Sequence, residues 1–151
     1  MATQTLNLSY TVHDDFDSVY QQLLDFRKFG ALHPFMKQVN LLSENNGAAL
    51  YEVFEEIKLL GFIPMKPNYK VEVTQNVADK TIRYYSEAQK GVYLTIDFSF
   101  VQDLNNKCIQ VTEAISLKSN PIVGFVFLRI LKNAHMPVFK NMDTAGLSKR
   151  W

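Results

Sequence analysis

Glu113 is the residue best placed to do chemistry. It lies between Val111 and Ile115 on the apolar face of an alternating segment that covers residues 108–118. A carboxyl group buried without a partner has a raised pKa and can act as a general acid or base. The same group could instead bond a hydroxyl group of a bound molecule, or pair structurally with an arginine or a tyrosine. The sequence leaves these alternatives open.

A tyrosine and a histidine could complement this carboxyl group. Tyr84 and Tyr85 are adjacent in an alternating segment, so one of the two rings must face the interior. An inward hydroxyl group could fix the polar end of a bound molecule, although a buried tyrosine that bonds the backbone is the commoner arrangement. His135 follows Ala134 at the margin of an apolar helical stripe. Its ring could reach an interior space or the rim of a sheet.

Three further carboxylates fall in another alternating segment. Glu52, Glu55 and Glu56 lie where the phase of the alternation is not settled by the sequence. In either phase one carboxylate points inward, because neighbours on a strand face opposite sides. A solvent-exposed position at the edge of the sheet, or a β-bulge, would explain an inward carboxylate that has no function.

The sequence does not indicate a metal site or a bound cofactor. His13, His33 and His135 are scattered and lack the paired spacing of metal ligands. Cys108 is the one cysteine, so an internal disulfide framework and a cysteine-only metal centre are excluded. We find no glycine-rich phosphate loop and no nucleophile elbow. No residue is therefore assigned a catalytic role from a motif.

Two alternating segments and a long helix must position these side chains. Phe98 and Phe100 share the apolar face of residues 92–102, and Val111 and Glu113 share that of residues 108–118. Ser119 or Asn120 can cap a following helix, and Pro121 suits its first position. At about 100° per residue, this helix has an apolar stripe that includes Phe127 and Leu131. We expect it to lie across the apolar face of the sheet.

The remaining elements complete one domain over residues 1–151. An alternating first strand ends at Val12, and apolar residues at helical spacing follow from Phe16 to Leu32. Short turns then separate further strands, which implies antiparallel neighbours; these strands are expected at residues 36–43, 49–60, 69–77 and 81–87. The prediction is an α+β fold: a curved seven-stranded antiparallel sheet gripping a long C-terminal helix, with a short helix pair between strands 1 and 2.

Charge and hydrophobicity argue against several classes of protein. The net charge of +1 argues against nucleic-acid binding. No signal peptide is evident at the N-terminus. The longest apolar run, Ile122–Leu128, is far shorter than the ~20 residues that span a bilayer. We therefore expect a cytoplasmic protein without a transmembrane segment.

The chain resembles the START-related helix-grip superfamily. The resemblance rests on the order of elements and on the segment from Phe16 to Val39, with its His33-Pro34 step before the second strand; Asn120-Pro121 and His135 in the terminal helix also look similar. The superfamily includes lipid-transfer domains, plant pollen allergens and bacterial polyketide cyclase/dehydrase-like proteins. The resemblance implies binding of a lipid, sterol, polyketide or other apolar molecule between sheet and helix. A minority of members are enzymes.

The leading hypothesis is a domain that binds or carries a hydrophobic small molecule in a cavity between the sheet and the C-terminal helix. This hypothesis favours binding over catalysis and leaves enzyme activity open. The residues expected to line the cavity are Tyr84, Phe98, Phe100, Val111, Glu113, Phe127, Leu131 and His135. One alternative is a cyclase or dehydratase that uses Glu113 with an inward tyrosine or His135 for acid–base catalysis.

Another alternative is a protein interaction module. Ile122, Phe125 and Val126 lie off the helical stripe and could form a homodimer contact. The apolar residues of segment 61–67 could pack on these first helical turns, or they could cover one end of the cavity.

Overall fold

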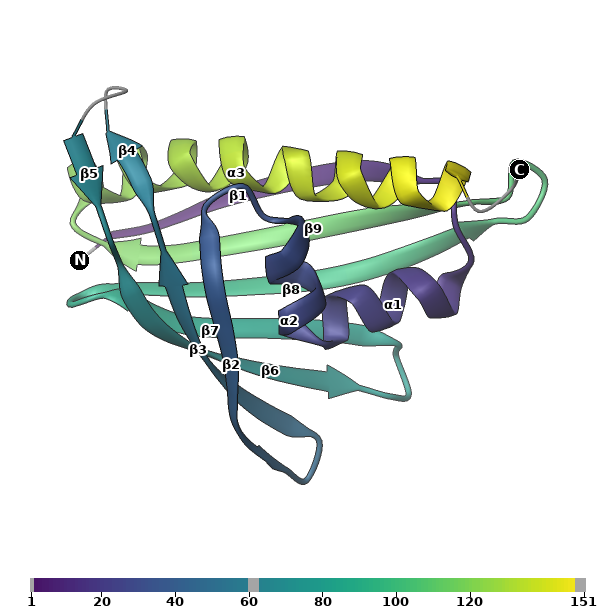
Figure 1. Ribbon diagram of the computed structural model, residues 1–151, viewed down its shortest axis with the longest axis horizontal. Helices are drawn as coiled ribbons and strands as arrows, with labels where there is room; N and C mark the ends of the chain where they lie inside the picture. The colour runs from purple at the N-terminus through teal and green to yellow at the C-terminus, as the bar shows by residue number, and fades with distance from the viewer. Residues whose placement is uncertain (1, 60–62, 149–151) are drawn as a thin grey trace.

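The computed structural model describes residues 2–59 and 63–148. Its main sheet has seven strands, all paired antiparallel (Figure 1). Across the sheet these strands run in the order β1 (Ala2–Val12), β9 (Cys108–Ser119), β8 (Val92–Asp103), β7 (Thr81–Gln89), β6 (Asn68–Asn76), β3 (Ala48–Glu55) and β2 (Met36–Asn45). The predicted seven-stranded antiparallel sheet is confirmed.

Two short helices, α1 (Phe16–Leu24) and α2 (Phe26–Leu32), connect β1 to β2. Asp15 caps α1, because its carboxylate accepts a hydrogen bond of 2.7 Å from the backbone N–H of Ser18. Asp25 both ends α1 and caps α2. The helix pair ends at His33, which precedes Pro34 and therefore takes an extended conformation.

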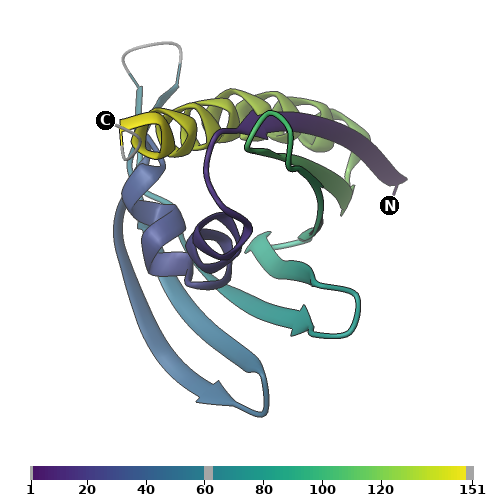
Figure 2. The same cartoon turned by 90° about the vertical axis from the view of Figure 1, so that its right-hand side faces the viewer.

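The long C-terminal helix α3 (Pro121–Ser148) crosses the concave side of the sheet. Figure 2 shows the sheet curling around α1, with α3 lying across the open side of the curl. Along β8 up to Phe98 and along β9 from Ile109, buried inward residues alternate with less buried outward residues. The C-terminal half of α3 presents its buried residues to this face, and Val138, Phe139 and Met142 are fully enclosed.

One predicted strand, residues 49–60, is divided in the structure. β3 ends at Glu55, and the chain continues as β4 (Ile57–Leu59), which pairs with β5 (Ile63–Met65) in a separate two-stranded sheet. The backbone N–H of Glu56 donates to the carbonyl of Phe35, at 2.9 Å, instead of continuing the ladder with β6. This long-range bond redirects the chain. Part of the predicted apolar loop at 61–67, including Phe62, lies outside the described residues.

By length and composition alone, α3 could cross a membrane. Its mean hydropathy reaches 1.3 over an 18-residue window, which the short run Ile122–Leu128 did not reveal. A core helix passes the same test, and the inner side of α3 packs along β1 and β9. Packing accounts for the apolar character of that side, whereas only 28% of the apolar window is buried.

Candidate functional site

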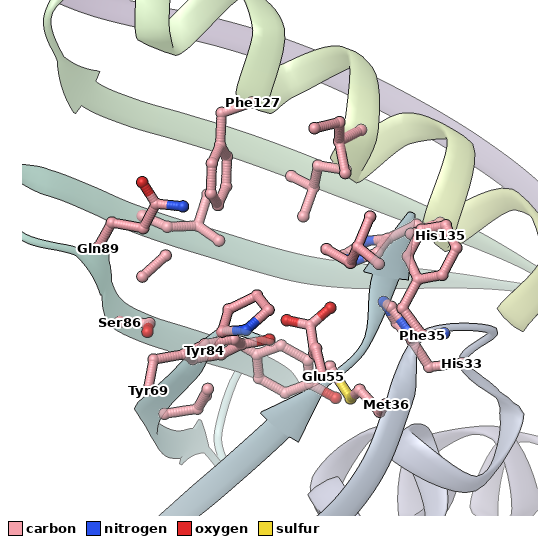
Figure 3. Close-up of a pocket in the computed structure, with 18 of the residues that line it drawn as sticks. His33, Phe35, Met36, Glu55, Tyr69, Tyr84, Ser86, Gln89, Phe127 and His135 are labelled. Atoms are coloured by element: carbon pink, nitrogen blue, oxygen red, sulfur yellow. Dashed lines mark hydrogen bonds between the residues drawn. The ribbon is translucent and has the colours of Figure 1, made fainter. Parts of the chain in front are cut away.

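A cavity of about 330 Å³ lies between the sheet and the N-terminal half of α3. This volume is at the low end of the range for small-molecule sites. Most of its lining is apolar (Figure 3). The apolar lining comes from α2, α3 and strands of both sheets, and includes Phe26, Phe29, Met65, Val71, Leu94, Ile96, Val123, Phe127, Ile130 and Leu131.

The cavity exists because α3 contacts the sheet unevenly. Phe139 and Met142, in its C-terminal half, are fully buried, whereas Phe127 and Leu131 in its N-terminal half are only partly buried. The sheet beneath the N-terminal half carries small inward residues on β7, namely Ser86 and Ala88. Side chains from the two layers therefore fail to fill the intervening space there.

Two hydroxyl groups at the cavity wall are already used by the protein. The Tyr84 hydroxyl donates a hydrogen bond to the backbone carbonyl of Leu23, near the end of α1. The Ser86 hydroxyl donates to the carbonyl of Lys70 at 2.6 Å. Because a hydroxyl group has a single proton, neither can also donate to a bound molecule while these bonds persist.

A buried carboxylate–imidazole pair lies at one end of the cavity. Glu113 on β9 is 0% exposed and His135 on α3 is 3% exposed. Oε1 of Glu113 bonds Nδ1 of His135, which leaves Nε2 as the second polar atom of the ring. His135 lines the cavity, whereas Glu113 lies behind it. A carboxylate held behind an imidazole fixes its orientation and favours a proton on Nδ1, so that Nε2 can accept a proton.

Part of this pair is unsatisfied among the described residues. Oε2 of Glu113 and the hydroxyl group of Tyr10 are both buried without a hydrogen-bond partner there. The pKa of Tyr10 is raised, first by burial and second by the charge of Glu113. The Tyr10 ring is stacked on Phe139, with centroids 4.1 Å apart. Tyr10 therefore belongs to the polar environment of Glu113.

His33 is a second imidazole at the cavity wall, with its ring centroid 5.9 Å from that of His135. The backbone N–H of Phe35 donates to its Nδ1 at 3.1 Å. Burial, and then the charge of His135, lowers the pKa of His33 to about 3. The ring is therefore neutral near pH 7, with its one proton on Nε2. His33 consequently supplies a hydrogen-bond donor of fixed position.

Glu55 is the carboxylate that the alternation of β3 points inward. Tyr51 and Val53 on the same face are buried, whereas Glu56 is exposed. Burial raises the pKa of Glu55, and a hydrogen bond from Tyr69 and the charge of His135 partly oppose this effect. Figure 3 shows the Glu55 carboxylate extending into the cavity near Tyr69. Glu55 and Tyr69 both line the cavity.

The structure brings half of the predicted site residues to the cavity. Tyr84, Phe127, Leu131 and His135 line it. The other four, Phe98, Phe100, Val111 and Glu113, lie on the same face of the sheet but are not part of the cavity wall.

Other side chains occupy the space over these core residues. Phe98 contacts the rings of Tyr84 and Phe139, while Phe100 contacts Phe16 and Tyr20 of α1. Glu113 is linked to the cavity wall by its bond to His135.

Sequence reasoning assigned no ligand contact to His33, Glu55 or Tyr69, although all three line the cavity. Glu55 was considered with its phase open, and the buried Tyr51 and Val53 settle that phase. The His33-Pro34 step was visible in the sequence. Its approach to His135, however, joins positions about a hundred residues apart, which no local pattern encodes.

No protein-family model and no curated protein matches the chain. Among solved structures it is similar to the Zhui aromatase/cyclase from Streptomyces sp. R1128, with a TM-score of 0.78 and 13% identity over 99% of this chain and 97% of that one. It is also similar to Ara h 8.0201, with a TM-score of 0.74 and 13% identity over 97% and 99% of the two chains. A norcoclaurine synthase from Thalictrum matches with a TM-score of 0.71 and 10% identity over 99% and 98%.

The element order and these matches define the class of fold. A seven-stranded antiparallel sheet that grips a long terminal helix, with two short helices after the first strand, is the helix-grip fold, and the chain shares it with these solved structures. The resemblance inferred from the sequence is confirmed at the level of the fold. Since this fold carries both binding proteins and enzymes, the function must be argued from the cavity.

Proposed function

We propose that this protein binds an apolar small molecule in the cavity between the sheet and α3. The observation that carries the proposal is an interior space of about 330 Å³ lined mainly by aromatic and aliphatic side chains. A molecule that fills it removes its own apolar surface from water, which stabilises the complex by about 25 cal/mol for each Å² buried. The fold-level neighbours include an aromatase/cyclase and a norcoclaurine synthase, whose names indicate small-molecule chemistry.

A cavity-filling substitution tests this proposal. Ala88 is buried on β7 and lines the cavity, so Ala88→Phe places a ring in the space that the ligand would occupy. Ala114→Phe on β9 is the matched control, because Ala114 is exposed on the outer face. The probe is N-phenyl-1-naphthylamine, whose fluorescence rises in apolar surroundings.

We expect saturable binding to the wild type and to Ala114→Phe, and at least tenfold weaker binding to Ala88→Phe. Equal affinity of all three proteins would contradict binding in this cavity. Native mass spectrometry after gentle purification provides an independent readout, in which a co-purified apolar molecule would be displaced by the probe.

The His135–Glu113 pair favours a second candidate function, acid–base catalysis on a bound carbonyl compound. Nε2 of His135 would take a proton from the carbon next to the carbonyl group, and the carbonyl oxygen would accept a hydrogen bond from Nε2–H of His33. The immediate products are an enolate and a protonated His135, and return of the proton regenerates both partners. Cyclase and dehydratase reactions begin with such a step.

Proton exchange tests this candidate without knowledge of the natural substrate. The protein should accelerate deuterium exchange at the α-carbons of 2-tetralone in D2O, followed by NMR. Glu113→Gln should abolish the acceleration, because a neutral amide cannot stabilise the protonated His135, while leaving binding of 2-tetralone largely intact. Exchange at the rate of buffer alone, with 2-tetralone demonstrably bound, would exclude this role.

We further propose a cytoplasmic location, which cell fractionation would test. The homodimer alternative rests on Ile122 and Phe125 of α3, which are 78% and 61% exposed. Light scattering distinguishes a dimer from a monomer.

A further inference from the structure

We infer that the ligand is an apolar molecule carrying one uncharged hydroxyl group, which is bound between Glu55 and His33. This inference rests on the proposed function, because it assigns the polar end of the same cavity. The polar atoms at the cavity wall that are free to bond a ligand determine its polar group.

Most of the polar atoms at the wall are already committed. The hydroxyl groups of Tyr84 and Ser86 donate to backbone carbonyls, and Nδ1 of His135 is bonded to Glu113. Gln89 lines the cavity near Phe127, away from His135, and is exposed to solvent. The other polar groups of the wall lie near His135. The ring centroid of His33 lies 5.9 Å from that of His135, and Glu55 lines the same cavity. Figure 3 shows Glu55, His33 and His135 directed into one part of the cavity.

These groups offer complementary hydrogen-bonding atoms. Nε2–H of His33 can only donate, because the bond from Phe35 to Nδ1 places the ring proton on Nε2. The Glu55 carboxylate accepts, and it has more acceptor sites than the hydrogen bond from Tyr69 uses. A hydroxyl group is the small neutral group that donates to a carboxylate and accepts from an imidazole at the same time. It therefore satisfies both partners.

Charge disfavours the anionic alternative. None of the described residues lining the cavity is a lysine or an arginine, whereas Glu55 lines it and Glu113 lies directly behind His135. A fatty acid or another carboxylate ligand would be placed near two acidic groups without a lysine or arginine counter-ion, and the positive charge that His135 can carry is already paired with Glu113. The wall therefore selects against carboxylic acids although its shape and apolarity suit them.

Three probes of similar size test the inference: 2-naphthol, 2-methylnaphthalene and 2-naphthoate, titrated by calorimetry at pH 7. We expect 2-naphthol to bind about tenfold more tightly than 2-methylnaphthalene, which corresponds to one hydrogen bond to a charged group. We expect 2-naphthoate to bind most weakly. Glu55→Leu should remove the preference for 2-naphthol while keeping the affinity for 2-methylnaphthalene.

The control is Glu56→Leu, which makes the same change on the exposed side of the chain and should keep the preference. Retained binding of 2-methylnaphthalene shows that the cavity of Glu55→Leu is intact. Because this substitution leaves the Tyr69 hydroxyl without its partner, the double variant Glu55→Leu/Tyr69→Phe removes that hydroxyl as a further check. Three results would each overturn the inference and leave the proposed function standing. The wild type could bind 2-naphthol and 2-methylnaphthalene equally, Glu55→Leu could keep its full preference for 2-naphthol, or 2-naphthoate could bind most tightly. Failure of all three probes to bind would overturn both.

Discussion

Glu113 on β9 and His135 on α3 form a buried pair that joins the sheet to the terminal helix beside the cavity. The two side chains are 0% and 4% exposed, so each group depends on the other for its hydrogen bond. Neither residue is near a chain end or a loop. The pair therefore contributes to the attachment of α3 as well as to the orientation of the His135 ring.

Removing one partner of this pair should destabilise the protein. Glu113→Leu leaves Nδ1 of His135 buried without its bond, and we expect a loss of about 3 kcal/mol in the free energy of unfolding. Glu113→Gln should cost less, because its amide oxygen can still accept from Nδ1–H. The double variant Glu113→Leu/His135→Phe should recover part of the loss. Urea denaturation measures all three, and identical stabilities of the Leu and Gln variants would contradict the account.

Stability should fall in mild acid because of His33. Its pKa is about 3 in the folded protein, against about 6.5 in an unfolded chain. Between these values the unfolded state binds the proton and the folded state does not, so stability is lost as the pH falls through this window. The contribution of His33 alone is a loss of about 2 kcal/mol between pH 7 and pH 5.

Comparison with His33→Phe isolates this contribution, since other groups titrate in the same range. Glu55 is one of them, and its raised pKa acts in the opposite direction, favouring the folded state in acid. The difference between wild type and variant should therefore shrink or change sign as the pH falls from 7 to 5. A difference that stays constant over this range would show that His33 is not held neutral.

Tyr84 should matter for stability and not for ligand affinity. Its hydroxyl group donates to the carbonyl of Leu23, one of the last carbonyls of α1, which lack partners within the helix. Tyr84→Phe should lower the free energy of unfolding by about 1 kcal/mol. The affinity for N-phenyl-1-naphthylamine should be unchanged within twofold. A large loss of affinity with unchanged stability would mean that the hydroxyl group serves the ligand instead.

Two glycines of α3 should respond differently to replacement by alanine. A Cβ at Gly146 would collide with the backbone carbonyl of His13 and approach Cβ of Asp14 to 2.9 Å. At Gly124 it would meet side-chain atoms, Oγ of Ser119 at 2.7 Å and the Gln4 amide at 3.2 Å, which can rotate away.

Alanine in a helix interior gains about 1 kcal/mol over glycine. We expect Gly146→Ala to lose stability despite this gain, because backbone atoms must move to make room. Gly124→Ala should be nearly neutral. Thermal unfolding compares the two variants, and equal shifts would contradict the close contact at Gly146.

The sequence predicted the fold well where local periodicity controls the structure. The alternation in residues 92–102 and 108–118 corresponds to the buried faces of β8 and β9, and Pro121 is the first residue of α3. The break after Glu55 was missed. It depends on the bond between Glu56 and Phe35, which lie about twenty residues apart, and no local pattern contains that information.

The candidate site was only partly accessible from the sequence, for a related reason. Periodicity shows which face of a strand is covered, but not which part of that face is filled. Phe100 lies on the predicted face, yet Phe16 and Tyr20 from α1 occupy the space above it. Glu113 and His135 were each singled out, whereas their pairing depends on how α3 lies across β9.

We propose above all that an apolar molecule occupies the space beneath the N-terminal half of α3. Intermolecular NMR contacts with bound 2-methylnaphthalene test it most directly. We predict nuclear Overhauser effects from the naphthalene protons to the methyl groups of Ile96, Val123 and Leu131, which face the cavity from the sheet and from the helix. Contacts confined to exposed side chains such as Val101, or the absence of any contact at saturating probe, would contradict the account.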